Sequence, residues 1–298
     1  MAQIVTVTIN PAIDESTSVE HVQANQKLRC EAPSFYPGGG GINVARAVHR
    51  LGGEAEAWYT SGGSSGQMLQ GLLHEEGVSC CAIPIQGRTR TNVSVWERAS
   101  DRQYRFGMPG PRLEQPEWQQ YLDAARELDP VPDYLVASGS LARGVPDEFY
   151  AKLAETVRNI GARFIVDTSG EPLRKAMEAG VYLVKPNLRE LNHLAGRELK
   201  EEWEQERMAG ELVQSGRAEV VVLSLGAGGA FLASSEGNVR LRSPTVPIRS
   251  RVGAGDSMMA GIVLALSRGR SLKEALNFGG AAGTVLADTR PNRVSGAA

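Results

Sequence analysis

Short runs of consecutive apolar residues, rich in valine and isoleucine, recur from about residue 115 onward and alternate with helix-like segments. The runs are DYLVASGS, RFIVDTSG, VYLVKPN and EVVVLSLG, at residues 133–140, 163–170, 181–187 and 219–226. Strands that are apolar on both sides are typical of parallel sheets buried on both faces. Between the first two runs, residues 146–161 predict a helix, with Pro146 at its start and Gly161 just after its end. The pattern predicts an α/β fold with helices on both faces of a mainly parallel sheet.

Two other segments alternate polar and apolar residues. TNVSVWE and RQYRF, separated by the turn-like RASD, predict an antiparallel hairpin with one face in water. Segments from about 15 to 37 and from about 89 to 106 therefore predict a small accessory sheet that covers a cleft or forms a dimer surface. No repeat, low-complexity tract or proline-rich linker separates these segments. We expect residues 1–298 to form a single domain with this lid inserted in it.

Composition narrows the classes of partner. With 42% hydrophobic and 22% charged residues, the chain has the composition of an ordinary globular protein. Its formal net charge of −2 gives no general attraction for nucleic acid or acidic membranes, so the expected partner is a small molecule. Any anionic ligand must then be bound by local arginine and lysine side chains.

Cysteine and histidine usage points to the cytoplasm. Cys30, Cys80 and Cys81 form no paired framework, and the four histidines form no metal-binding motif. The N-terminal QIVTVTI predicts a first strand rather than a targeting signal. No apolar run approaches the roughly 20 residues that span a bilayer.

RVGAGDSMMAG, residues 251–261, places a single carboxylate, Asp256, between small residues and an apolar segment that predicts a helix. One interpretation is capping, because Asp is a favoured N-cap and suits the positive end of the helix dipole. The other interpretation is a functional acid beside backbone amides that glycine leaves accessible to an anion. This segment alone does not decide between them.

YPGGGGINVARAVHRLGG places four glycines before a helix expected from about Ile42 to Leu51. Glycines there let backbone amides approach a ligand, although a flexible connection would look the same. Asn43 in the first turn offers a donor and an acceptor to a hydroxylated ligand. Asp14, in TINPAID, follows the first strand, where open α/β sheets gather ligands, but it could equally end a turn.

Further polar residues suggest a site for phosphates, although GxxxxGK[ST] and an N-terminal GxGxxG are both absent. Four basic residues lie in the expected lid: Lys27, Arg29, Arg90 and Arg105. Each alone could be a solvent-exposed strand residue, but together they could bind a phosphate. In LVKPNLREL, Asn187 and Glu190 could hold a hydrated Mg²⁺ or form a simple capping box. In LSLGAGGAFL, a nucleotide phosphate or a tight hairpin would explain Ser224, Gly226 and Gly228.

These motifs, in this order, resemble those of the ribokinase (PfkB-type) family of carbohydrate kinases. The resemblance covers nearly the whole chain, from TINPAID through PGGGGINVAR, GGSSG, SGSL, VDTSGE, KPNLREL and SLGAGGA to VGAGDSMMAG. It implies a three-layer αβα domain with a β-lid that also joins two subunits in a homodimer. KLRCEAPSFYPGGGGINVAR and YRFGMPG look most like the family's 6-phosphofructokinase branch, which phosphorylates fructose 6-phosphate with ATP.

The resemblance also implies roles for individual residues. Asp256 would be the base that accepts the hydroxyl proton, next to an anion hole formed by the amides of Gly253, Ala254 and Gly255. The sugar phosphate would be held by Asp14, Gly39, Gly40, Asn43, Arg90 and Ser140, with Lys27, Arg29 and Arg105 near its phosphate, some of them across the dimer. ATP would be bound by Lys185, Asn187, Ser224, Gly226 and Gly228, and Mg²⁺ by Glu190 through water. A K⁺ ion would be held by the carbonyls of Ser250 and Val252.

An ordinary carboxylic acid would suffice as the base. Phosphoryl transfer passes through a loose transition state, so the hydroxyl loses its proton late, and an Asp with the ordinary pKa of model peptides, ~3.9, is adequate.

Two departures from the family pattern bear on these roles. SGSLARG has Ala142 and Arg143 where relatives have prolines, at the rim of the sugar site. After FGGAAGTVLA the sequence continues only as DTRPNRVSGAA, whereas relatives have a longer loop that completes the adenine pocket and the K⁺ site.

Two other functions stay open. 1-Phosphofructokinases and tagatose-6-phosphate kinases usually carry a lysine where this chain has Gly40, and these activities are the alternative within the same chemistry. A sugar-phosphate sensor without catalysis is the alternative of a different class.

Overall fold

The computed structural model describes residues 4–242 and 253–286. Within these residues, nine strands form one sheet in the order β13-β12-β11-β10-β9-β8-β1-β4-β5. From β11 to β5 every neighbouring pair is parallel, and β12 and β13 add an antiparallel edge. The strands are β1 (Ile4–Thr8), β4 (Glu56–Ser61), β5 (Cys80–Pro84), β8 (Tyr134–Ser138), β9 (Arg163–Asp167), β10 (Val181–Val184), β11 (Ala218–Ser224), β12 (Ala230–Ser234) and β13 (Val239–Leu241).

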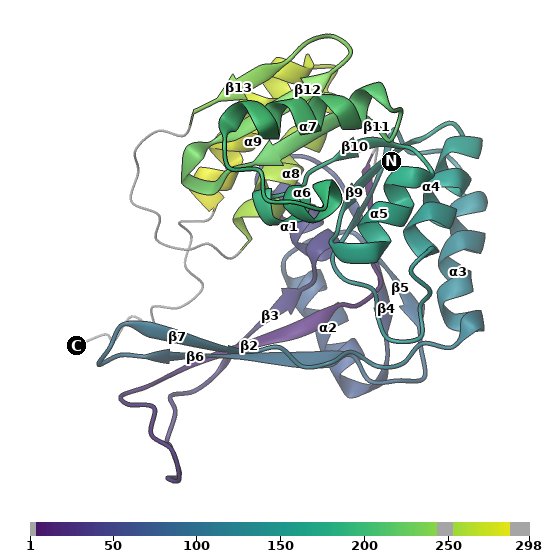
Figure 1. Ribbon diagram of the computed structural model, residues 1–298. Helices are drawn as coiled ribbons and strands as arrows, with labels where there is room; N and C mark the ends of the chain where they lie inside the picture. Colours follow the sequence, from purple (N-terminus) through teal and green to yellow (C-terminus); the bar gives the residue numbers. More distant parts are fainter. Residues whose placement is uncertain (1–3, 243–252, 287–298) are drawn as a thin grey trace.

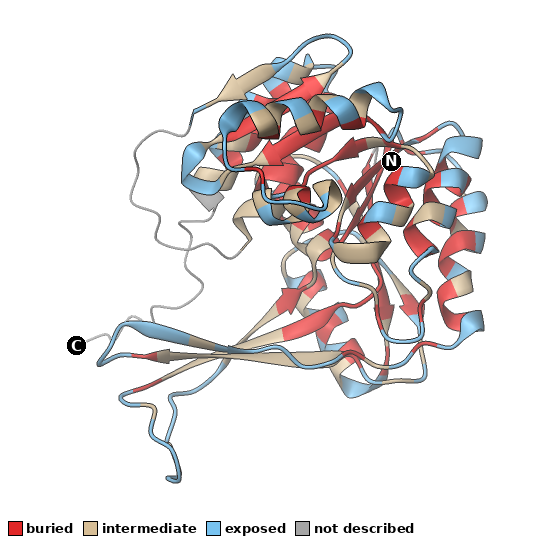
Figure 2. Ribbon diagram, viewed as in Figure 1, coloured by how far each residue is buried: buried red, intermediate tan, exposed pale blue. Residues whose placement is uncertain are grey.

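Helices cover both faces of this sheet, as the continuous apolar strands predict (Figure 1). One apolar core lies between the sheet and α1 (Gly40–Arg50), α2 (Gly63–Glu75), α8 (Ala254–Ser267) and α9 (Leu272–Leu286). The other core lies against α3 (Gln115–Arg126), α4 (Phe149–Asn159), α5 (Gly170–Glu178), α6 (Leu188–Ala195) and α7 (Glu202–Gln214). Figure 2 shows the sheet as mostly buried. The fold is therefore the expected three-layer α/β arrangement.

A second sheet of four strands forms the lid, in the order β3-β2-β6-β7. It consists of β2 (Ala12–Val19), β3 (Ser34–Gly38), β6 (Arg90–Glu97) and β7 (Arg102–Phe106), and it extends away from the main body (Figure 1). The β6–β7 pair is the antiparallel hairpin that its polar–apolar alternation predicts. The sheet begins at Ala12, which places Asp14 on the lid strand β2 rather than directly after β1.

Two helices begin two or three residues away from the starts expected from the sequence. The helix expected from Pro146 begins at Phe149, because residues 146–148 form a turn in which the carbonyl of Pro146 accepts from the Phe149 amide. The helix expected from Ile42 begins at Gly40, because the Gly39 carbonyl accepts from the Asn43 amide.

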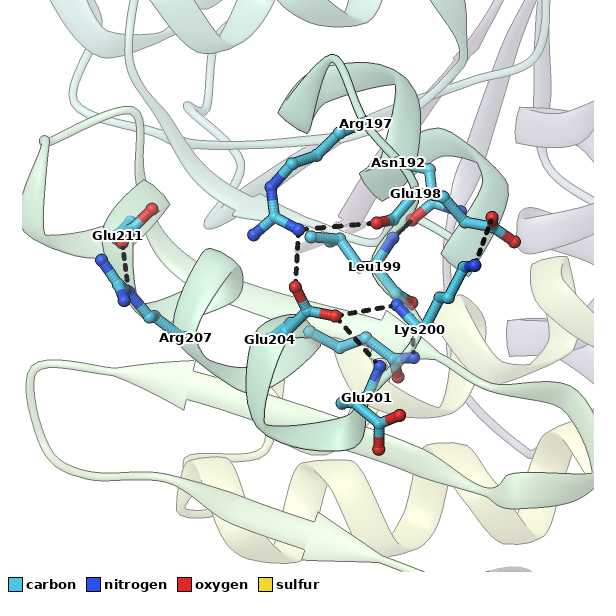
Figure 3. A network of polar contacts seen from close by, with 10 residues as sticks. Asn192, Arg197, Glu198, Leu199, Lys200, Glu201, Glu204, Arg207 and Glu211 are labelled. Carbon is cyan, nitrogen blue, oxygen red and sulfur yellow. Dashed lines mark hydrogen bonds and ion pairs between the residues drawn. The ribbon is translucent and has the colours of Figure 1, made fainter.

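The connection between α6 and α7 is fixed by polar contacts (Figure 3). Glu204 accepts hydrogen bonds from the Lys200 and Glu201 amides and pairs with Arg197, so its carboxylate satisfies free amides at the start of α7. Asn192 in α6 accepts from the Leu199 amide. These contacts hold α6, the helix that carries Glu190, against α7.

In the described part of the chain, no helix combines the length and apolar character needed to cross a membrane.

Candidate active site

The glycine run lies across the carboxyl ends of β1 and β8. The Thr8 hydroxyl accepts from the Ile42 amide at 2.8 Å, which fixes the start of α1 over β1. A Cβ on Gly41 would lie 2.5 Å from the Val7 carbonyl oxygen, and one on Gly40 would collide with the Ser138 hydroxyl. The glycines are therefore required for this close approach. Connections from β1 and β8 leave in opposite directions here, at the switch point where open α/β sheets bind ligands.

A pocket of about 230 Å³ opens beside this point. It lies over the carboxyl ends of β8 and β9 and reaches the first turn of α8. Its lining is polar and consists of Gly40, Ser138, Gly139, Ser140, Asp167, Thr168, Ser169, Glu190 and Asp256.

Asp256 does not cap its helix. The N-cap is Gly253, whose left-handed φ of 76° suits glycine, and Asp256 is the third residue of α8. No side chain caps the first-turn amides of α8 within the described residues. The Asp256 carboxylate instead faces the pocket and accepts a hydrogen bond of 2.9 Å from Asn43 Nδ2. The capping interpretation is therefore wrong, and both the carboxylate and the helix-end amides can meet a ligand.

A buried ion pair lies beneath Asp256. Lys185 Nζ lies 3.1 Å from Asp167 Oδ2, and Lys185 is only 5% exposed. Burial favours neutral Lys185, but the charges of Asp167, Asp256 and Glu190 outweigh it and raise the pKa of this lysine, so it stays a cation. A Cβ on Gly255 would lie 3.3 Å from Lys185 Nζ, so the first turn of α8 lies close to this charge.

The same surroundings change the acidity of Asp256. Burial and the negative charge of Asp167 raise the pKa of Asp256 to about 7, although Asn43 and Lys185 act in the opposite direction. An ordinary pKa is adequate for such a base, but the pKa of Asp256 is shifted by burial and by a neighbour 89 positions earlier in the sequence.

The predicted nucleotide residues meet at the ends of β10 and β11. Asn187 pairs with Ser224 in an isolated bridge, and the Ser224 amide donates to the Pro186 carbonyl at 2.9 Å. Gly226 and Gly228 belong to a 3₁₀ turn that joins β11 to antiparallel β12. This is the tight hairpin that the sequence offered as one explanation of these glycines. Asn187 and Glu190 form the capping box of α6, with both bonds at 2.9 Å. Glu190 also lines the pocket, and burial raises its pKa.

The predicted sugar residues lie at the junction of the lid and the main sheet. Asp14 Oδ1 accepts from Asn92 across β2 and β6, and a Cβ on Gly38 would collide with its carboxylate. Ser140 lines the pocket and accepts from Asn10 Nδ2 at 3.2 Å. Gly40 lines the pocket, and Gly39, with φ 121°, precedes it as the N-cap of α1.

Arg90 has a role that the sequence did not indicate. Its guanidinium donates to the carbonyls of Asn10, Pro11 and Met108, at 2.9, 3.4 and 3.1 Å. These carbonyls belong to the connections into and out of the lid, so Arg90 joins the two connections.

The other basic lid residues are exposed. Lys27 and Arg29 lie in the loop between β2 and β3. Arg105 on β7 lies opposite Ser94, on the same lid face as Asp14. Ser250 and Val252, expected to bind K⁺, lie outside the described residues.

Sequence reasoning missed Asp167 and Arg46. Asp167 carries the signal that was applied to Asp14, an acid at the end of a strand, and this signal could have identified it. Arg46 was missed because its main partner, Glu76, lies 30 positions away in the sequence, although Asn43 lies only three positions before it.

Comparison with known proteins shows the family of the chain. A model of the pfkB family carbohydrate kinases matches residues 7–291. ATP-dependent 6-phosphofructokinase isozyme 2 of Mycobacterium tuberculosis is 45% identical over 284 residues, which cover 95% of this chain and 84% of that protein. The protein of that name from Escherichia coli is 43% identical over 285 residues, 95% of this chain and 92% of that one.

The chain belongs to the pfkB family of carbohydrate kinases.

Solved structures of phosphofructokinase-2 from Escherichia coli are closely similar, each at 42% identity. The complex with fructose-6-phosphate and the tetrameric inhibited form match with TM-scores of 0.91 and 0.92, and each match covers 96% of this chain and 94% of that one. A complex with potassium matches with a TM-score of 0.91 over 95% of this chain and 92% of that one. The expected fold and the expected class of enzyme, an ATP-dependent phosphotransferase of the phosphofructokinase type with an alcohol group as acceptor, are confirmed.

The raised pKa of Asp256 predicts a pH dependence. If Asp256 acts as the general base, it must be ionised to accept a proton, so kcat/KM for ATP, measured at saturating sugar phosphate, should fall as pH decreases through about 7. Below that pH the decrease should approach about tenfold per unit, as for a single ionisation. A profile that stays flat down to about pH 5.5 would contradict the assignment of this pKa to the base.

Proposed function

We propose that the protein transfers the γ-phosphoryl group of ATP to the free primary hydroxyl of fructose 6-phosphate, forming fructose 1,6-bisphosphate and ADP. One observation carries the proposal: Asp256, with a pKa of about 7, lies between the lid-side residues Asn43 and Ser140 and the charge of Lys185. The choice of fructose 6-phosphate is supported by the relatives named 6-phosphofructokinase and by the complex of the Escherichia coli enzyme with that sugar.

The chemical step needs one proton acceptor and a site for negative charge. The hydroxyl oxygen attacks the γ-phosphorus while its proton passes to the Asp256 carboxylate. The bond from the γ-phosphorus to the bridging oxygen breaks, and its electron pair leaves with ADP. A base with a pKa near 7 is ionised in about half of the molecules at neutral pH and still accepts a proton readily.

The first turn of α8 suits the transferred group. Within the described residues no side chain caps its amides, and the helix dipole adds positive potential at that end. In our proposal, the amides of Gly253, Ala254 and Gly255 bind the oxygens of the phosphoryl group during its transfer. Because these donors are fixed before the reaction, they stabilise the transition state without reorganisation.

The remaining site residues form two groups, one for the sugar phosphate and one for ATP. The sugar phosphate would be bound by Asp14, Gly39, Gly40, Asn43, Arg90 and Ser140, with Lys27, Arg29 and Arg105 near its phosphate. ATP would lie along the ends of β10 and β11, at Lys185, Asn187, Ser224, Gly226 and Gly228. For Arg90, this role requires the guanidinium to donate to the sugar in addition to, or in place of, the three carbonyls.

Metal ions complete the proposal. Glu190 fits a hydrated Mg²⁺, because only one of its oxygens accepts from the Asn187 amide and its side chain lines the pocket. When bound, Mg²⁺ would offset the charge of the ATP phosphates. A K⁺ ion at the carbonyls of Ser250 and Val252 is supported by the potassium complex of the Escherichia coli enzyme.

A direct assay decides the substrate. Detection of ADP by a coupled assay should show kcat/KM for fructose 6-phosphate at least about 100-fold above that for fructose 1-phosphate or tagatose 6-phosphate, because a site built around substrate hydroxyls rejects misplaced ones. Preference for another sugar phosphate would overturn the substrate, whereas binding without turnover of any of them would identify a sensor.

We also propose a homodimer formed through the lid, in line with the tetrameric form of the Escherichia coli relative. Val93, Val95, Tyr104 and Phe106 share the lid face opposite to Asp14. Phe106 is 50% exposed, and a second copy of the chain would bury this face.

Charge placed on this face tests the dimer. Phe106→Glu should convert a dimer into a monomer in sedimentation velocity, because an unpaired charge would be buried at the contact. Trp203→Glu is the matched control, since Trp203 on α7 is 61% exposed and lies away from the lid. An unchanged mass for Phe106→Glu would contradict this interface.

A further inference from the structure

A chain of polar contacts leads away from Asp256 into the body of the protein. Asn43 Nδ2 donates to Asp256 Oδ2 at 2.9 Å, and Asn43 Oδ1 accepts from Arg46 Nη1 at 3.5 Å. Asn43 and Arg46 are three residues apart on α1, so their side chains lie on the same face of the helix. The Arg46 side chain is 11% exposed and is therefore held largely inside the protein.

Glu76 fixes the plane of the Arg46 guanidinium. Its two carboxylate oxygens accept from Nε, at 2.7 Å, and from Nη2, so the pair is bidentate. Burial would raise the pKa of Glu76, but the hydrogen bonds and charge of Arg46 lower it overall. With Nε and Nη2 engaged, Nη1 remains, and it points to the Pro37 carbonyl at 2.9 Å and to Asn43. Lysine has no planar fork and could not make both sets of contacts.

The two neighbours of Asn43 select one orientation of its amide. Arg46 can only donate hydrogen bonds, so it requires the Oδ1 end of the amide. An ionised carboxylate can only accept, so Asp256 requires the Nδ2 end. A reversed amide would place Oδ1 against the carboxylate and the NH₂ group against a cation. The arrangement therefore favours ionised Asp256, the form that can accept a proton.

We propose that Arg46 is a positioning residue for the catalytic base: by holding Asn43 Oδ1, it keeps the amide donating to Asp256. This inference rests on the proposed function, in which Asp256 is the base. Within residues 4–242 and 253–286, the other charged groups around Asp256 are Asp167 from β9, Lys185 after β10 and Glu190 from α6. None of these contacts fixes the orientation of Asn43, so that role falls to Arg46.

The contact with Pro37 extends this role to the lid. Pro37 is the penultimate residue of β3, so one nitrogen of Arg46 joins the base of a lid strand to the residue that orients Asp256. A lid displaced at Pro37 would alter the same contact.

The test compares two arginines that share Glu76. Arg50 lies one turn further along α1 and contacts Glu76 at 3.5 Å with a half-exposed side chain, and within the described residues it makes no hydrogen bond to Asn43. Arg46→Gln should lower kcat by about 10-fold to 100-fold, as expected when a reacting group is misplaced. Arg50→Gln removes the same charge beside the same acid and should leave kcat within about twofold.

Two further readouts separate positioning from a structural role. The acidic limb of the kcat/KM profile should move to higher pH in Arg46→Gln but not in Arg50→Gln, because the hydrogen bond that lowers the pKa of Asp256 is lost. The double variant Asn43→Ala/Arg46→Gln should be no slower than Asn43→Ala alone, since Arg46 acts through Asn43. Multiplicative effects in the double variant would overturn the proposal.

A second variant serves as a control for loss of folding. Arg46→Gln leaves Glu76 without its main partner, so Arg46→Gln/Glu76→Gln, which removes both charges, should retain the wild-type fold and show the same loss of kcat. If neither variant folds, or if both fold with normal kcat, Arg46 is structural and the proposal fails. A wild-type protein that phosphorylates no sugar phosphate would instead contradict the proposed function, so the two failures are distinguishable.

Discussion

The site depends on the confinement of one carboxylate, Asp256, next to a second, Asp167, and close to the buried cation of Lys185, which pairs with Asp167. A rise of the Asp256 pKa from 3.8 to about 7 corresponds to a cost of roughly 4 kcal/mol for ionising it in the folded protein. Because the folded pKa is raised, this cost is absent below about pH 4 and is complete above about pH 7. Lys185 and Asn43 each stabilise the ionised form, so this cost would be larger without them.

Backbone geometry makes this confinement possible. Parallel strands all present their carboxyl ends at the same edge of the sheet, so Thr8, Ser138, Asp167, Lys185 and Ser224 lie along it in the order of the strands. The glycines of α1 allow its first turn to lie directly on β1 and β8, and Gly253 allows α8 to begin without a side-chain cap. Two helix ends and one sheet edge thus converge on a single pocket.

Local patterns predicted most of this arrangement. Strand composition indicated the parallel sheet, the hairpin alternation indicated the lid, and the Gly-Ala-Gly-Asp and four-glycine segments contain residues that line or border the pocket. What the sequence did not indicate arises from contacts between distant positions. The pairing of Lys185 with Asp167, the contact of Arg46 with Glu76 and the three carbonyls bound by Arg90 all depend on tertiary packing. The pKa of Asp256 could not be predicted for the same reason, because burial and a remote charge determine it.

The central claim is that Asp256 takes the proton from the sugar hydroxyl, and steady-state kinetics of Asp256→Asn test it most directly. Asparagine keeps the size of the side chain and can still contact Asn43, but it cannot accept the proton. The account predicts that kcat falls by about 100-fold or more, as for loss of a general base, while the affinity for fructose 6-phosphate, measured by titration, changes by less than about threefold. A variant with near-normal kcat would contradict the account and leave Asp256 as a structural residue.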